Sequence, residues 1–136
     1  MTDSKKKLFE LACKTRENSY SPYSHHKVGA AILTEDGRMF GGCNIENSSY
    51  GATICAERVA IHQALAEDPK TRIKEVMVVT DATPAWPPCG LCRQVLSEFA
   101  EPHTLVHTAN LKKEITSFKF SDLLPQAFTP GHLIKA

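Results

Sequence analysis

The sequence has almost no net charge and no long hydrophobic run, and each absence excludes a class of partner. Its 136 residues carry 16 basic and 15 acidic side chains, a formal net charge of +1. So small an excess gives no positive field that would hold nucleic acid or an anionic membrane, and we expect neither partner. The longest apolar runs, residues 28–33 and 76–79, are far shorter than the roughly 20 residues that cross a bilayer.

Linker-like and secretory features are also scarce. Seven glycines and eight prolines are an ordinary share, which argues against a flexible linker or a low-complexity tract. A polar, lysine-rich start precedes a mixed sequence, whereas a signal peptide would have an apolar stretch there. With 42% hydrophobic residues, a chain of this size can bury a core without disulfides. We therefore expect one cytoplasmic domain spanning residues 1–136.

Helical and strand periodicities alternate along the chain. Helical spacing of apolar residues, with the breaks that flank it, predicts helices over 4–19, 55–67 and 92–99 and a last helical turn at 121–127. Apolar and β-branched runs predict strands over 28–34, 38–43, 75–80, 104–108 and 114–119. Asp36-Gly37 between the first two strands is typical of a hairpin turn. The alternation predicts a layered α/β domain with a mixed five-stranded sheet flanked by helices.

Three of the five cysteines are spaced as metal ligands. An odd cysteine count in a reducing compartment argues against a disulfide framework. Cys89 and Cys92 start a predicted helix three residues apart, so both thiols can face one point; alone, they also fit a redox dithiol or half of a zinc knuckle. Cys55 starts another predicted helix. Three thiolates leave one tetrahedral position of Zn²⁺ open for water, as in catalytic zinc sites.

Glu57 and Arg58 follow the first of these cysteines and have the chemistry to assist such a site. Side chains in the first turn of a helix lean toward its N-terminus, so Glu57 can reach the cavity without binding the metal. A carboxylate there can take a proton from water and deliver it to a substrate nitrogen. Helix N-termini and hydrogen bonds from Arg58 would offset the negative charge of three thiolates. The alternative for Arg58 is a solvent-facing helix position.

Cys13 and Cys43 fall outside this spacing. A closed structural zinc site with Cys43 as fourth ligand is an alternative to the catalytic site. Structural sites usually pair their cysteines two to four residues apart, whereas Cys43 lies twelve positions before Cys55. We expect Cys13 and Cys43 to be buried packing residues.

Two motifs resemble the zinc-dependent cytidine deaminases. They are Cys-Ala-Glu-Arg at 55–58 and Pro-Cys-Gly-Leu-Cys-Arg-Gln at 88–94, which match the zinc deaminase signature with cysteine in place of histidine. The resemblance is to the short homotetrameric branch and also covers residues 20–24, 28–31, 42–47, 123–125 and 128. It implies hydrolytic deamination of cytidine and 2′-deoxycytidine to uridine and 2′-deoxyuridine in pyrimidine salvage, with one zinc ion per subunit.

The resemblance also implies a role for each matching residue. Zinc would be held by Cys55, Cys89 and Cys92. Hydroxide on the zinc would add to C4 of cytosine, while Glu57 protonates N3 and then the leaving nitrogen. The substrate would also contact Ala56, and Pro87 through its main-chain carbonyl.

A ribose site follows from the same resemblance. Asn44 and Glu46 would hold the sugar hydroxyls. A free base has no sugar hydroxyl and would leave a buried carboxylate without a hydrogen-bond donor, so such a site selects nucleosides. The alternative is that Asn44 and Glu46 are polar residues of a solvated loop. Tyr50 would line the pocket. Phe128 would reach a neighbouring active site, which implies a homotetramer, although from its sequence context alone Phe128 is more simply a core aromatic.

The chain departs from the family pattern around the pyrimidine. His26 replaces the usual phenylalanine that stacks on the base, unless His26 points elsewhere. Trp86 and Pro87 replace a smaller apolar residue followed by serine or threonine. We hypothesise that Trp86 supplies the aromatic surface that His26 gives up.

Two other functions stay open at this point. A deaminase of another cytosine nucleoside, of the blasticidin S type, shares the metal motif, although Asn44 and Glu46 argue against it. A zinc-stabilised binding module without catalysis comes from a different class. Nucleotide and nucleic-acid deaminases typically carry histidine in place of Cys55, and no basic cluster accompanies the ribose loop, so we favour nucleosides.

Overall fold

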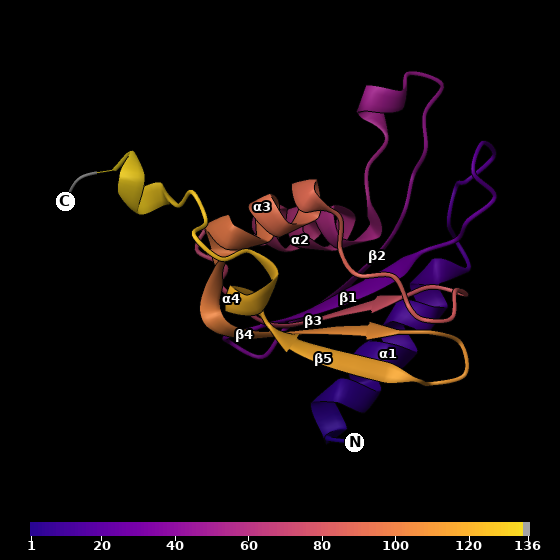
Figure 1. Ribbon diagram of the computed structural model, residues 1–136, viewed down its shortest axis with the longest axis horizontal. Coiled ribbons are helices and arrows are strands. Elements are labelled where there is room, and N and C mark those ends of the chain that lie inside the picture. The colour runs from indigo at the N-terminus through magenta and orange to yellow at the C-terminus, as the bar shows by residue number, and fades with distance from the viewer. Residues whose placement is uncertain (135–136) are drawn as a thin grey trace.

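Five strands form one sheet in the order β2-β1-β3-β4-β5 in the computed structural model, which describes residues 1–134 (Figure 1). The strands are β1 (Gly29–Thr34), β2 (Met39–Cys43), β3 (Ile73–Val79), β4 (Ala100–Ala109) and β5 (Ile115–Lys119). β1 pairs antiparallel with β2 and β3, β4 pairs antiparallel with β5, and β3 pairs parallel with β4. The sheet is therefore mixed, as predicted.

Helices cover both faces of this sheet (Figure 1). They are α1 (Asp3–Arg16), α2 (Ala56–Glu67), α3 (Gly90–Phe99) and α4 (Phe120–Leu123), with short 3₁₀ turns at Tyr50–Ala52 and Pro130–His132. Alternate residues of β3 enter two cores: Val76 and Val78 pack with α2, α3 and α4, whereas Met77 and Val79 pack with α1. Because both faces of β3 are covered, its residues 76–79 form a continuous apolar run instead of an alternating one.

The β1–β2 hairpin turns where the sequence predicts it. Gly37 has a φ of 89°, which a residue without Cβ adopts at no steric cost. The backbone N–H of Thr34 donates to the carbonyl of Arg38 at 2.9 Å and closes the turn.

Gly42 on β2 allows α2 to approach the sheet closely. A Cβ at this position would lie 2.5 Å from the carbonyl oxygen of Ala56 and 2.7 Å from the amide nitrogen of Ala60. The first turn of α2 therefore lies directly on β2. This contact fixes the helix end that carries Cys55 and Glu57.

Three predicted boundaries differ from the structure by three residues or more, and the others differ by one or two residues or agree. α1 ends at Arg16 rather than at 19, because residues 17–19 form turns whose amides bond back to α1 carbonyls. β4 begins at Ala100, directly after α3, rather than at 104. The last helix ends at Leu123, two residues before Pro125. Within residues 1–134, no helix has both the length and the apolar character that crossing a membrane requires.

Candidate active site

Cys55, Cys89 and Cys92 meet between the ends of two helices. Cys55 is the N-cap of α2 and Cys89 the N-cap of α3, and neither thiol caps its own helix. The three sulfur atoms lie within 4.8 Å of one another, and those of Cys55 and Cys89 are 3.7 Å apart. The two helices therefore direct their N-terminal dipoles and free N–H groups toward the cluster, which favours negative charge on sulfur.

The electrostatics of the cluster call for a cation. A hydrogen bond from the Cys92 thiol lowers the pKa of Cys55 to about 5, with further help from Arg58 and Cys89. The same hydrogen bond to Cys55 raises the pKa of Cys92, and burial adds to the shift. One sulfur is thus ionised readily, while full ionisation of all three needs a positive charge between them. Three soft donors at this separation fit zinc, with one tetrahedral position left for water.

Arg58 contacts the cluster from the side of α2. Its Nη2 atom lies 3.7 Å from the Cys55 sulfur and donates to the carbonyl of Thr53 at 3.3 Å. Its Nε atom is buried and has no hydrogen-bond partner within residues 1–134. A partly buried guanidinium with one nitrogen 3.7 Å from a sulfur favours a thiolate and argues against the solvent-facing alternative for Arg58.

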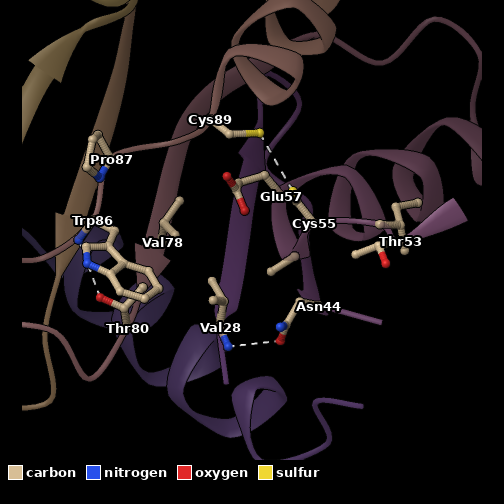
Figure 2. Close-up of a pocket in the computed structure, with 12 residues that line it drawn as sticks. Val28, Asn44, Thr53, Cys55, Glu57, Val78, Thr80, Trp86, Pro87 and Cys89 are labelled. Carbon is tan, nitrogen blue, oxygen red and sulfur yellow. Dashed lines mark hydrogen bonds between the residues drawn. The ribbon is translucent and has the colours of Figure 1, made fainter. Parts of the chain in front are cut away.

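Glu57 is buried beside the cysteines, with 3% of its surface exposed. Loss of solvation raises the pKa of Glu57 to about 7, and the charge of Cys55 adds to this shift. Its carboxyl group faces the pocket in Figure 2, close to Cys55 and Cys89. A group in this position can hold or release a proton next to the open position of the cluster.

A pocket opens in front of Glu57 and two of the cysteines (Figure 2). Its lining residues come from the position before β1, the end of β3, the loops that precede α2 and α3 and the first turn of α2: Val28, Asn44, Thr53, Ile54, Cys55, Ala56, Glu57, Val78, Thr80, Trp86, Pro87 and Cys89. Sequence analysis predicts six of these as site residues: Asn44, Cys55, Ala56, Glu57, Pro87 and Cys89. It also gives Trp86, as a hypothesis. Val28, Thr53, Ile54, Val78 and Thr80 were missed, because apolar and threonine residues carry no chemical signature; their position next to motif residues is the one available signal.

Asn44 lies at the pocket and is 9% exposed. Its amide oxygen accepts from the hydroxyl of Ser19 at 2.5 Å and from the backbone N–H of Val28 at 2.9 Å, and its amide nitrogen donates to the carbonyl of His26 at 2.8 Å. An amide nitrogen carries two protons, so one N–H of Asn44 stays available to a ligand.

Glu46 and Tyr50 line a neighbouring pocket, which shares Thr53 with the first. Sequence reasoning expected a buried carboxylate at Glu46, whereas this side chain is partly exposed. It accepts hydrogen bonds from the backbone of Tyr23 and Ser24 and from the Ser24 hydroxyl, which together lower its pKa. Tyr50 is 77% exposed and makes an edge contact with the Tyr23 ring.

The remaining predicted residues lie farther from the cluster. Phe128 is 55% exposed and stacks on His132 with ring centroids 5.1 Å apart, so a core role for it is wrong. Cys13 packs at the edge of the α1 core. Among the described residues the metal-ligand cluster does not include Cys43, and burial raises the pKa of both Cys13 and Cys43.

Comparisons with known proteins agree with this geometry. A family model for the cytidine and deoxycytidylate deaminase zinc-binding region matches residues 2–108. A cytidine deaminase of Halalkalibacterium halodurans is 45% identical over 90% of this chain and 92% of its own, and one of Sporosarcina psychrophila is 44% identical over 93% of both. The crystal structure of cytidine deaminase from Burkholderia pseudomallei superposes with a TM-score of 0.86 and 43% identity, covering 94% of this chain and all of that one. The chain therefore belongs to the cytidine and deoxycytidylate deaminase family, and its domain is a zinc-binding one.

Proposed function

We propose that this protein hydrolyses cytidine and 2′-deoxycytidine to uridine and 2′-deoxyuridine and releases ammonia. One observation carries the proposal: three thiols that fit zinc lie together, and two of them line one pocket with a buried carboxylate. The relatives' shared name, cytidine deaminase, supports the choice of substrate. In the overall reaction, one water supplies the oxygen at C4, and its two protons end on the leaving ammonia and on N3 of the new ring amide.

The chain's own residues divide this chemistry between them. Cys55, Cys89 and Cys92 would hold zinc, which when bound supplies the Lewis acidity that makes water a nucleophile at neutral pH. Glu57 would carry protons to N3 of the base and then to the departing amino nitrogen. Its burial excludes bulk water, so protons reach the base through this carboxyl group.

The substrate contacts follow from the groups that line the pocket. The free N–H of Asn44 would donate to a ribose hydroxyl, and Glu46 would accept from one after giving up part of its contact with Ser24. Ala56 and the carbonyl of Pro87 would contact the base next to the leaving amino group, since proline keeps its carbonyl. Tyr50 would close the sugar end.

A panel of substrates tests this function. The purified protein is incubated with cytidine, 2′-deoxycytidine, cytosine, cytidine monophosphate and blasticidin S, and ammonia release is followed. We expect release from both nucleosides and little from the free base or the nucleotide. Release from blasticidin S alone would favour the other nucleoside deaminase, and none from any compound by zinc-loaded protein would favour a binding module.

We also propose a homotetramer in which Phe128 reaches the active site of a neighbouring subunit. The exposed Phe128 ring and the position of the C-terminal segment, which extends away from the sheet in Figure 1, support this. Coexpression of Phe128→Ala and Glu57→Gln chains tests it, because mixed tetramers contain sites with an intact Glu57 and a partner's Phe128. We expect the mixture to be more active than either variant alone; the same low activity would contradict a shared site.

Two broader expectations complete the proposal. One catalytic domain would span residues 1–136, of which 135 and 136 lie outside the described residues. The enzyme would act in the cytoplasm, in pyrimidine salvage, where cytosine nucleosides enter the uracil pool.

A further inference from the structure

Trp86 presents its ring to the pocket from the loop between β3 and α3. The side chain is 43% exposed and belongs to the pocket lining. In Figure 2 the indole lies near Val78 and Thr80, on the other side of the pocket from Thr53 and Cys55. The backbone N–H of Trp86 donates to the Thr80 hydroxyl at 3.4 Å. Prolines at 87 and 88 restrict the backbone that follows, and the partly exposed ring remains accessible from the pocket.

His26 contacts Trp86 and is absent from the set of described residues that line the pocket. The two ring centroids are 4.9 Å apart at an interplanar angle of 70°, an edge-to-face arrangement. The His26 backbone is anchored on both sides: its N–H donates to the Ser24 hydroxyl at 3.1 Å, and its carbonyl accepts from Asn44 at 2.8 Å. The anchored backbone of His26 thus places its imidazole against the indole.

We propose that Trp86 is the residue that contacts the pyrimidine ring of the substrate, and that His26 is a positioning residue that holds the indole in place. The inference rests on the proposed function, because it takes the ligand of this pocket to be a cytosine nucleoside. An exposed aromatic face that belongs to a pocket offers apolar area and a π-surface to a planar base. His26 therefore acts on the base through Trp86.

The chain offers a direct probe of this contact, because Trp86 is its one tryptophan. A nucleoside that stacks on the indole changes its fluorescence, and no other tryptophan contributes to the signal. Uridine serves as the ligand, since it is the product and undergoes no reaction. We expect saturable quenching in the zinc-loaded enzyme and also in a Glu57→Gln variant. Saturation of the enzyme with uridine, shown by competitive inhibition, without any change in emission would overturn the proposal.

Kinetics of three variants separate the two roles. Trp86→Ala should raise the KM for cytidine about tenfold, as loss of an aromatic contact implies, and Trp86→Phe should raise it less. His26→Ala should raise KM with little change in kcat and shift the Trp86 emission maximum. Leu105→Ala is the matched control, because Leu105 is 40% exposed and lies outside the pocket; its KM and emission should equal those of the unmodified protein.

The outcomes distinguish this inference from the function on which it rests. If cytidine is deaminated but Trp86→Ala leaves KM unchanged, the inference is wrong and the function stands. If no ammonia is released from any cytosine nucleoside, the function fails, and quenching by uridine then tests binding alone. An unchanged emission maximum in His26→Ala would contradict the positioning role. If Trp86→Ala does not fold, the KM of Trp86→Phe still tests the contact with the base.

Discussion

Two buried glutamates, Glu57 and Glu75, differ in what surrounds them. Glu57 is 3% exposed and lies beside Cys55, facing a pocket. Glu75 is 8% exposed and lies on the α1 side of the sheet, where Nε2 of His107 is 2.8 Å from its Oε2 and the Ser4 hydroxyl donates to its Oε1 at 3.1 Å. His107 in turn bonds Ser117 at 2.7 Å.

The difference separates an acid used for chemistry from one used for structure. The side-chain partners of Glu75 are protein groups on α1 and β4, and His107 extends the network to Ser117 on β5, so these hydrogen bonds tie α1, β3, β4 and β5 together. Burial of Glu57 instead raises its pKa to about 7 and leaves the carboxyl group facing a space for a ligand. Burying a carboxyl group costs solvation free energy, and a carboxyl group that is buried in a pocket without a salt bridge to offset this cost indicates a functional site.

Substitution of Glu57 has the largest expected effect. Glu57→Gln removes the proton carrier, so kcat for cytidine should fall by more than about 10⁴, the upper range for one such group. Removing a desolvated acid should leave the free energy of unfolding unchanged or higher. Ammonia release and urea denaturation of zinc-loaded protein measure both. A variant that keeps a tenth of its activity would contradict the assignment.

The contact of Arg58 with Cys55 sharpens the same comparison. Arg58→Met should lower zinc affinity by about 10–100-fold, as loss of a group that hydrogen-bonds a ligand typically does. Arg72→Met is the matched control, because the Arg72 guanidinium donates to the carbonyls of Glu98 and Ala100. Competition with a zinc chelator measures the affinity. Equal affinities of the two variants would show that Arg58 does not support the thiolate.

The structural acid should give the opposite pattern. Glu75→Ala leaves His107 and Ser4 without their partner, so the free energy of unfolding should fall by about 2–3 kcal/mol. The kcat for cytidine of the folded protein should not change. Denaturant titration and a cytidine assay below the transition measure the two effects. A loss of kcat without a loss of stability would reverse the distinction between the two glutamates.

The smallest effect concerns the pH dependence of stability. Burial lowers the pKa of His107 from its ordinary value of 6.5, and the charge of Lys5 lowers it further, whereas Glu75 raises it. Ser117 forms a hydrogen bond with the other ring nitrogen of His107. Below 6.5 the unfolded chain binds the proton more readily than the folded one, so stability should fall as pH falls. His107→Gln should flatten this dependence, and His103→Gln, at an exposed position, should not. Equal slopes in both variants would exclude His107 as the source.

Much of the fold could be predicted because its signals are local. Asp36-Gly37 has the turn chemistry of a hairpin, and α2 ends where the sequence predicts. The start of β4 could not be predicted, because a shift in register opposes Ile73 to Ala100 and Glu75 to Leu105, so residues 101–104 extend the strand irregularly. Such a bulge depends on the neighbouring strand and leaves no periodic trace in sequence.

The site divides in the same way. The three cysteines, Glu57 and Arg58 lie in two short motifs, so their chemistry and spacing were sufficient to predict that they meet. The edge contact of His26 with Trp86 and the pairing of Glu75 with His107 join residues that are far apart in the chain. Their partners are set by sheet order and loop packing, which no single motif encodes.

Metal content measured on one set of preparations tests the central claim most directly. The unmodified protein and the variants Cys43→Ser, Cys89→Ser and Cys92→Ser are purified alike, and zinc is quantified per chain together with ammonia release from cytidine. We predict one zinc per chain and full activity for the first two, and loss of both in the last two. Loss of zinc from Cys43→Ser, or deamination by metal-free protein, would contradict a catalytic centre held by three sulfurs beside Glu57.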